Sequence, residues 1–279
     1  MTQPLRVGLV QLRSGRMMDH NIEMASGFIR EAHGSGAKFV STPEMTHMIE
    51  AESEALLKAV RPEAEDPGVA AFSALAEELG IWLLIGSLAI ARGDGKVANR
   101  SFLFDPKGAI RARYDKIHLF DVELAGGERY RESRHYAPGS EAVLVDLPFA
   151  RLGLTICYDL RFPYLYRMLA KEGAEIITVP AAFTKTTGEA HWHALLRARA
   201  IETGAFILAP AQGGRVEVGR ETYGHSLVVS PWGQVLGEAG NDPGVLVADL
   251  DLARVAEARA RVPSLTHDRD GIAVRHMGA

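Results

Sequence analysis

Short apolar runs alternate with longer amphipathic stretches along the chain. The short runs are typical of buried strands, and the longer stretches have apolar positions at helical spacing. In the first half, this pattern predicts strands at residues 6–12, 37–42, 81–90, 101–105 and 109–114, and helices at residues 21–33 and 68–79. Gly80 follows the second of these helices in the place of a C-cap, and a Pro-Lys-Gly turn joins the last two strands as a hairpin.

The second half repeats this alternation more loosely. The predicted strands are residues 142–147, 150–157, 175–180, 205–210, 225–230, 234–238 and 245–250, and the predicted helices are residues 163–172, 190–203 and 252–261. Because strands and helices interleave from end to end, we expect an α/β fold in which helices cover the sheets. No repeat, low-complexity tract or linker divides the chain, so we expect one domain over residues 1–279, with residues 263–279 as a polar C-terminal arm.

Composition and charge narrow the classes of function. Of the 279 residues, 47% are hydrophobic and 24% are charged, as in an ordinary globular protein. The net charge of −4 lacks the basic excess that nucleic-acid binding requires. No apolar run reaches the roughly 18 residues of a membrane span, and the first residues lack the features of a signal peptide. We expect a cytoplasmic protein that acts on a small molecule, without nucleic-acid or membrane partners.

The single cysteine, Cys157, is the first candidate for chemistry. It has no partner for an internal disulfide and cannot supply a cysteine-rich metal site. It ends a predicted strand, and a helix is predicted to begin near Pro163, so it lies where α/β sheets place their ligands. Nearby backbone N–H groups and a cation would favour the thiolate form. Cysteine is also commonly buried and inert, so this position alone does not establish a nucleophile.

Two charged residues also follow predicted strands and could assist a nucleophilic thiol. Such a thiol needs a proton acceptor, and the carbonyl it attacks needs a group that stabilises the oxyanion. Glu44 follows strand 37–42 and could accept the proton, and Lys116 follows strand 109–114 and could hold the oxyanion. Taken alone, each is better explained as an ordinary surface residue, and periodicity does not show that distant residues meet.

The segments around these residues resemble those of the nitrilase superfamily of carbon–nitrogen hydrolases. The matching segments are RVGLVQL at the start, STPEM around Glu44, RYDKIHLFD around Lys116 and LTICYDLRFP around Cys157. Three matches in the family's Glu–Lys–Cys order are far more specific than one. The resemblance implies a four-layer α–β–β–α sandwich, and a homodimer or larger homo-oligomer that commonly forms by packing helices beside the active sites.

The resemblance also implies a role for each residue. Cys157 attacks an amide carbonyl while Glu44 takes the thiol proton, and Glu44 then protonates the leaving amine and activates water against the thioester. Lys116 and the backbone N–H of Tyr158 hold the oxyanion. Glu132, in RYRES, matches a second glutamate that would orient Lys116 or the substrate, and a surface ion pair is its alternative role.

No cofactor and no metal are expected. His191 and His193 are two positions apart on a predicted helix and therefore point to different faces. The sequence does not favour two other functions, a non-catalytic binding protein and a thiol redox sensor. A non-catalytic relative would be expected to have lost one of the three catalytic residues, and a thiol redox sensor would need a resolving cysteine. A neighbouring Lys116 is also expected to make Cys157 alkylate faster than free cysteine near neutral pH.

The segments 180–203 and 222–233 resemble a branch of the family that contains deaminated glutathione amidases and omega-amidases. The first class cleaves deaminated glutathione to 2-oxoglutarate and cysteinylglycine, and the sequence leans towards it. The alternatives are an omega-amidase that acts on 2-oxoglutaramate, and a nitrile hydrolase with the same Glu, Lys and Cys.

Both amide substrates carry an α-keto acid carboxylate, which requires a cation and hydroxyl donors in the pocket wall. Arg161 could bind this carboxylate through two parallel hydrogen bonds, or it could pair with Asp159. Thr184 and Thr187 could donate their hydroxyl groups to the substrate. Alternatively, Thr187 could cap the helix predicted to begin at residue 190.

Overall fold

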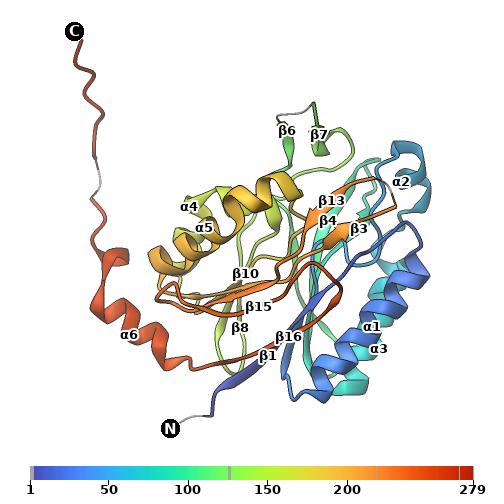
Figure 1. The fold of residues 1–279 in the computed structure, drawn as a ribbon, viewed down its shortest axis with the longest axis horizontal. Helices are drawn as coiled ribbons and strands as arrows, with labels where there is room; N and C mark the ends of the chain where they lie inside the picture. Colours follow the sequence, from blue (N-terminus) through green and yellow to red (C-terminus); the bar gives the residue numbers. More distant parts are fainter. Residues whose placement is uncertain (1–2, 125–126, 218, 270, 279) are drawn as a thin grey trace.

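Two six-stranded sheets form the centre of the fold (Figure 1). The computed structural model describes residues 3–124, 127–217, 219–269 and 271–278. In spatial order, the first sheet contains β16 (Gly244–Leu250), β1 (Leu5–Gln11), β2 (Phe39–Ser41), β3 (Trp82–Ala91), β4 (Val97–Phe104) and β5 (Ile110–Asp115). The second contains β15 (Val235–Glu238), β14 (Leu227–Val229), β11 (Phe206–Ala209), β10 (Ile176–Thr178), β9 (Arg151–Leu154) and β8 (Val143–Asp146).

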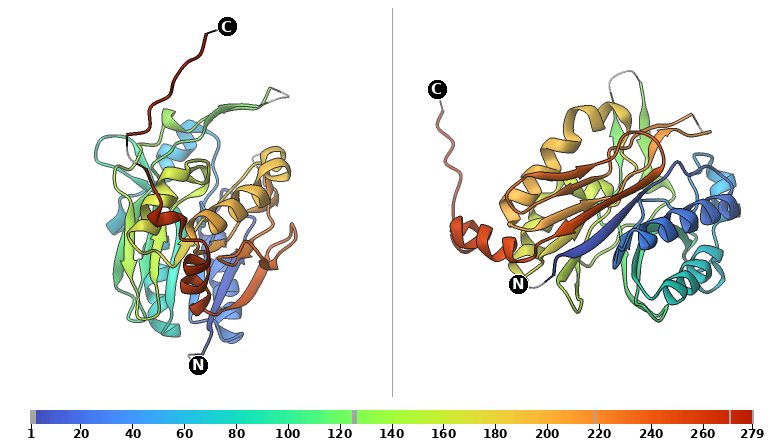
Figure 2. Two further views of the ribbon diagram at one scale, coloured as in Figure 1. Left: turned by 90° about the vertical axis from the view of Figure 1, so that its left-hand side faces the viewer. Right: turned by 60° about the horizontal axis from the view of Figure 1, so that its bottom comes forward.

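Helices cover the outer face of each sheet. The helices are α1 (Met18–Gly34), α2 (Ser53–Ala59), α3 (Pro67–Leu79), α4 (Pro163–Lys171), α5 (Lys185–Thr203) and α6 (Ala253–Arg261). Figures 1 and 2 show α1 and α3 outside the first sheet, and α4 and α5 outside the second. The α–β–β–α sandwich expected from the sequence is confirmed.

The apolar strands of the first sheet are buried on both faces. In β1, Leu9 belongs to the core between the two sheets, and Val10 belongs to the core beneath α1 and α3. In β3, Leu84 belongs to the core between the sheets and Leu83 to the core beneath the helices. Successive side chains of a strand point to opposite faces, so these strands carry continuous apolar runs instead of an apolar–polar alternation.

The parallel strands bring the candidate residues to one edge of the sandwich. β1, β2 and β3 are parallel to one another, as are β9, β10 and β11. Glu44 follows β2, Lys116 follows β5 and Cys157 follows β9. At Gly86 in β3, a side chain would clash with the backbone of Thr42 and with the ring of Pro180. Glycine at this position therefore lets the loops after β2 and β10 approach each other beside the site.

Several elements differ from the sequence-based expectations. β4 begins at Val97 instead of residue 101, and α5 begins at Lys185 instead of residue 190. The hairpin strands β6 (Asp121–Glu123) and β7 (Arg129–Arg131), the hairpin strands β12 (Gly213–Arg215) and β13 (Glu221–Tyr223), and helix α2 were not expected. The hairpin strands have three residues each and carry charged side chains, so no hydrophobic period marks them.

The C-terminal segment contacts α4 and then leaves the body of the sandwich. Asp268 pairs with Arg167 and Lys171 of α4, with 2.9 Å between the Lys171 ammonium and the carboxylate. Residues 271–278 are exposed and form neither helix nor strand, and Figure 1 shows them extending away from the body. Across the described residues, every helix is too short or too polar to cross a membrane.

Candidate active site

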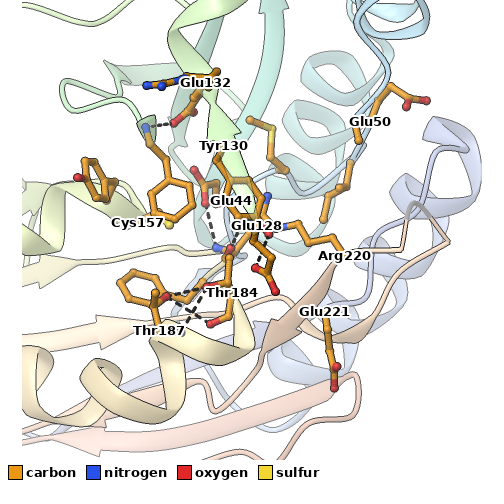
Figure 3. Close-up of a pocket in the computed structure, with 18 of the residues that line it drawn as sticks. Glu44, Glu50, Glu128, Tyr130, Glu132, Cys157, Thr184, Thr187, Arg220 and Glu221 are labelled. Carbon is orange, nitrogen blue, oxygen red and sulfur yellow. Dashed lines mark hydrogen bonds between the residues drawn. The ribbon is translucent and has the colours of Figure 1, made fainter. Parts of the chain in front are cut away.

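The structure brings Glu44, Lys116, Glu132 and Cys157 together in one cavity of about 700 Å³ (Figure 3). The cavity lies at the strand ends, beside the two short hairpins, which contribute Tyr130 and other lining residues. Its size falls within the roughly 300–1,000 Å³ of typical small-molecule sites. The lining also includes Tyr158, Thr184 and Thr187, but not Arg161.

Cys157 occupies a sharp turn between β9 and α4. It begins a 3₁₀ helix, Cys157–Arg161, and its φ of +48° lies in the left-handed region, which is strained for a residue with a side chain. Its N–H donates to the carbonyl of Pro180 over 2.9 Å. The N–H of Tyr158 lies in the first turn, where N–H groups have no carbonyl partner within the helix. A group bound in the cavity can therefore use this donor.

Asp159 holds this turn in place. Its buried carboxylate accepts hydrogen bonds from the Ile156 N–H at 2.9 Å and from the Tyr114 hydroxyl at 2.7 Å. It also accepts from the N–H of His118 at 3.0 Å, and the imidazole of that residue lies 2.7 Å away. These partners account for Asp159, and the structure contains no Arg161–Asp159 ion pair of the kind considered from the sequence.

Lys116 lies between two carboxylates. Its ammonium is 2.8 Å from Oε1 of Glu44 and 2.9 Å from Oε2 of Glu132. The second oxygen of Glu44 accepts the N–H of Ala182 at 2.9 Å, and Glu132 accepts the N–H of Phe120 at 2.6 Å. Lys116 and Glu44 are buried, at 2% and 4% exposure. Glu132 thus contacts the lysine, as the resemblance implied.

The neighbouring charges shift the pKa values of Lys116 and Glu44. Burial acts to lower the pKa of Lys116, but the charges of Glu132 and Glu44 outweigh burial and raise it well above its usual range. Burial acts to raise the pKa of Glu44, but the charge and hydrogen bond of Lys116 hold it below its ordinary value. Both groups are therefore charged at neutral pH.

The pKa of the Cys157 thiol is shifted in the direction that favours its neutral form. Burial, together with the charge of Glu44, raises the pKa of Cys157 well above that of an ordinary thiol, and the opposing effect of Lys116 is smaller. This raised pKa argues against the expectation that Lys116 makes Cys157 alkylate faster than free cysteine near neutral pH. Two carboxylates already share the ammonium, so a thiolate would add a second uncompensated negative charge.

Asn99 was missed from the sequence, although it contacts both carboxylates. Its side-chain NH₂ group donates to Glu44 at 2.9 Å and to Glu132 at 3.1 Å, and its backbone carbonyl accepts the backbone N–H of Lys116 at 2.9 Å. It lies 1% exposed in β4. A polar residue within a buried strand was the available signal, because buried polar groups need partners.

Arg161 does not line the cavity, so the expectation that it grips a substrate carboxylate there is not met. Its guanidinium lies over the rings of Tyr158 and Phe183, at 5.9 and 5.3 Å from their centroids, and contacts His191 at 3.3 Å. The cations that do line the cavity include Arg220, which precedes β13 (Figure 3).

Arg220 retains hydrogen-bonding capacity towards a ligand. Its guanidinium donates to the carbonyl of Ala182 and lies 5.4 Å from the ring centroid of Tyr130. Among the residues that the structure describes, its buried Nε has no hydrogen-bond partner and no carboxylate forms an ion pair with the guanidinium. Buried polar groups of this kind usually acquire a partner, so Arg220 is suited to an anionic ligand.

Thr184 and Thr187 have a structural role in addition to their position at the cavity. Thr184 is the N-cap of α5, and its hydroxyl accepts the N–H of Thr187. The two hydroxyl groups are also 2.8 Å apart. The alternative in which Thr187 caps the helix is wrong, because α5 begins at Lys185 and its N-cap is Thr184.

A thiol, a carboxylate and an ammonium line one cavity, and these are the groups that hydrolysis by a cysteine nucleophile would require. Residues 6–260 match the model of the carbon–nitrogen hydrolase family. The chain is 40% identical to a deaminated glutathione amidase of Yersinia enterocolitica, over 94% of this chain and 92% of that protein. It is 36% identical to the human omega-amidase NIT2, over 96% of each.

A solved structure shows the same fold. Nit3 of Saccharomyces cerevisiae, a member of branch 10 of the nitrilase superfamily, superposes with a TM-score of 0.85 at 29% identity, over 98% of each chain. The chain belongs to the carbon–nitrogen hydrolase family. The resemblance and the enzyme class expected from the sequence, a carbon–nitrogen hydrolase of the amidase kind, are confirmed.

The raised thiol pKa predicts a displaced alkylation profile. The thiolate is the reacting form, so the rate of iodoacetamide alkylation should rise only above the pH range of free cysteine, whose pKa is about 8.5. In Glu44→Gln, removal of the negative charge should move the rise to lower pH. Mass spectrometry of the labelled protein measures both profiles against free cysteine. A parent profile with its midpoint at or below that of free cysteine would contradict this prediction.

Proposed function

We propose that the chain hydrolyses deaminated glutathione to 2-oxoglutarate and cysteinylglycine through a thioester on Cys157. One observation carries this proposal: the only thiol of the chain lines the same cavity as a buried carboxylate that lies 2.8 Å from a buried ammonium. The proposal also rests on the 40% identity to a deaminated glutathione amidase.

The proposed first half-reaction forms the thioester. The sulfur of Cys157 attacks the amide carbonyl carbon while its proton passes to Glu44. The oxyanion accepts hydrogen bonds from Lys116 and from the N–H of Tyr158. The tetrahedral intermediate then collapses, the C–N bond breaks, and Glu44 returns the proton to the leaving amine of cysteinylglycine.

The proposed second half-reaction releases the acid. Glu44 takes a proton from water, and the hydroxide attacks the thioester carbonyl at the same oxyanion site. The C–S bond breaks, the sulfur of Cys157 regains a proton from Glu44, and 2-oxoglutarate leaves. Glu132 contacts Lys116 throughout, and we assign it the role of positioning that ammonium.

The charge of the cavity wall supports a substrate with two carboxylates. Around the buried groups, the lining contains the cationic residues Arg129, Arg131, Lys185, Arg215 and Arg220, and the acidic residues Glu50, Glu128 and Glu221. Deaminated glutathione carries a carboxylate at each end, whereas 2-oxoglutaramate carries one and is shorter. We assign the partnerless Nε of Arg220 to a substrate carboxylate, in place of Arg161.

An omega-amidase activity on 2-oxoglutaramate is the second candidate, because the chain is also 36% identical to the human omega-amidase. Mass spectrometry of product formation from deaminated glutathione, 2-oxoglutaramate and a simple nitrile separates the candidates. We expect the highest kcat/KM with deaminated glutathione, and none of the three should be turned over by a folded Cys157→Ala variant. Equal or faster turnover of either other compound would reject the substrate assignment, and an active alanine variant would reject the thioester.

Removal of the Arg220 guanidinium should weaken substrate binding. A hydrogen bond to a charged group contributes about 1.5–3 kcal/mol, so Arg220→Met should raise the KM for deaminated glutathione by roughly tenfold or more. Arg161→Met removes the same group outside the cavity lining and should change the KM far less. Steady-state kinetics of both variants measures this difference. A larger KM effect from Arg161→Met would show that Arg161, and not Arg220, binds the substrate carboxylate.

We also propose a cytoplasmic homodimer that forms through α4 and α5. Tyr164 and Met168 of α4 and Ile201 of α5 are 56%, 48% and 56% exposed, which leaves apolar surface on these outer helices. The family resemblance favours a second copy as the partner. The single free cysteine agrees with a reducing compartment.

A charge on this face should separate the protomers. Met168→Glu places a carboxylate on α4 and should yield a monomer in analytical ultracentrifugation. Met17→Glu, at a position that is 67% exposed beside α1, is the matched control and should remain a dimer. A monomeric parent protein, or a dimeric Met168→Glu variant, would count against this interface.

A further inference from the structure

Three side chains that the proposed reaction does not use meet at the surface beside α5. The Nε2 atom of His193 lies 2.9 Å from Oε1 of Glu238, and the Nδ1 atom of His225 lies 2.8 Å from the same oxygen. His193 belongs to α5, His225 lies between β13 and β14, and Glu238 ends β15. Three separate segments thus direct two ring nitrogens and a carboxylate to one point.

The surrounding contacts fix the orientation of these rings. The ring of Tyr223 stacks on His225 with 4.3 Å between centroids, and the ring of His193 stands edge-on to His225 at 5.9 Å. A side chain at Gly188 in α5 would clash with Tyr223, so glycine there allows the helix to pack directly on this ring.

The backbone of His225 is also held on both sides. Its N–H donates to the carbonyl of Gly240 at 2.9 Å, and its own carbonyl accepts the indole N–H of the buried Trp192 at 2.8 Å. Its φ of +54° is unusual for a residue with a side chain, and these two bonds stabilise it. The imidazole of His225 is therefore held towards Glu238 before any ligand arrives.

We propose that His193, His225 and Glu238 form a surface binding site for a divalent transition-metal ion such as Zn²⁺. Their ligand atoms lie within 4.8 Å of one another, so small side-chain rotations bring them to the Zn–N and Zn–O distances of about 2.0–2.2 Å. Two imidazoles favour zinc over magnesium or calcium, which prefer oxygen ligands. Water would complete the coordination, because all three side chains are partly exposed.

The charge of the cluster suits a cation. The Glu238 carboxylate supplies the negative charge, and a metal ion replaces any proton held between the carboxylate and each imidazole. The sequence-based expectation of no metal considered His191 as the partner of His193. The convergent partners come instead from segments 32 and 45 positions further along the chain.

A bound ion would link α5, the segment before β14, and β15. Binding to the folded state alone raises the melting temperature. It would also fix Tyr223, the last residue of the hairpin strand β13 that follows Arg220. The site is nevertheless separate from the cavity, whose lining includes none of the three ligands.

Isothermal titration of the full chain with Zn²⁺ tests this proposal. We expect one ion per chain and a rise in melting temperature. Loss of a ligand should weaken binding by at least the roughly 10–100-fold seen when outer-shell partners are removed, in both His193→Gln and Glu238→Gln. His20→Gln, which removes an exposed histidine of α1, should bind as the parent does, and so should Cys157→Ala, which excludes the active-site thiol as the ligand.

Circular dichroism of each metal-free variant verifies its fold, and Glu238→Gln provides a second test should His193→Gln fail to fold. The absence of zinc binding by the parent would overturn the proposal. Parent-like affinity in folded His193→Gln or Glu238→Gln, or a loss confined to Cys157→Ala, would overturn it as well.

Discussion

One buried ammonium, that of Lys116, contacts two carboxylates, and the charge balance of these three groups governs the site. Lys116 lies within 3 Å of both Glu44 and Glu132, so the three groups together carry one net negative charge. A thiolate at Cys157 would make that two negative charges in a water-poor region, where each uncompensated charge is costly. Transfer of the thiol proton to Glu44 leaves the net charge unchanged. The arrangement therefore favours proton transfer during attack over a preformed thiolate.

The fold supplies this arrangement by ending three strands at one edge of a double sheet. Burial on both faces of the strands leaves their ends as the places where polar residues can gather, and each charged group there finds a specific partner. Asn99 and the N–H of Ala182 complete the hydrogen bonds of Glu44, and Asp159 holds the turn that presents Cys157. The N-cap of α5, Thr184, also lines the cavity, and the short hairpins contribute further lining residues such as Tyr130.

Local patterns predicted an α/β fold with helices over the sheets, because long apolar runs mark buried strands wherever they occur, whereas the four-layer sandwich came from the family resemblance. The proximity of Glu44, Lys116, Glu132 and Cys157 came from a family resemblance, since no periodicity records contacts between residues 16 or more positions apart. Asn99 was missed because its partners are distant in the chain.

The two arginines, Arg161 and Arg220, also show that local sequence patterns do not predict which side chains line the cavity. Arg161 was favoured by its nearness to Cys157 in sequence, but its guanidinium lies over the rings of Tyr158 and Phe183 and not in the cavity. Arg220 lies beside a three-residue hairpin strand that has no hydrophobic period. The cluster beside α5 was hidden for the same reason, because its members come from three elements.

The protonation state of Cys157 in the resting protein is the most direct test of this account. Cys157 is the only cysteine, so an S–H stretching band in the infrared spectrum belongs to it alone, and Cys157→Ala provides the blank. The charge balance around Lys116 predicts that the band is present at neutral pH. Its absence at neutral pH in the unmodified protein would show a resting thiolate and contradict the account.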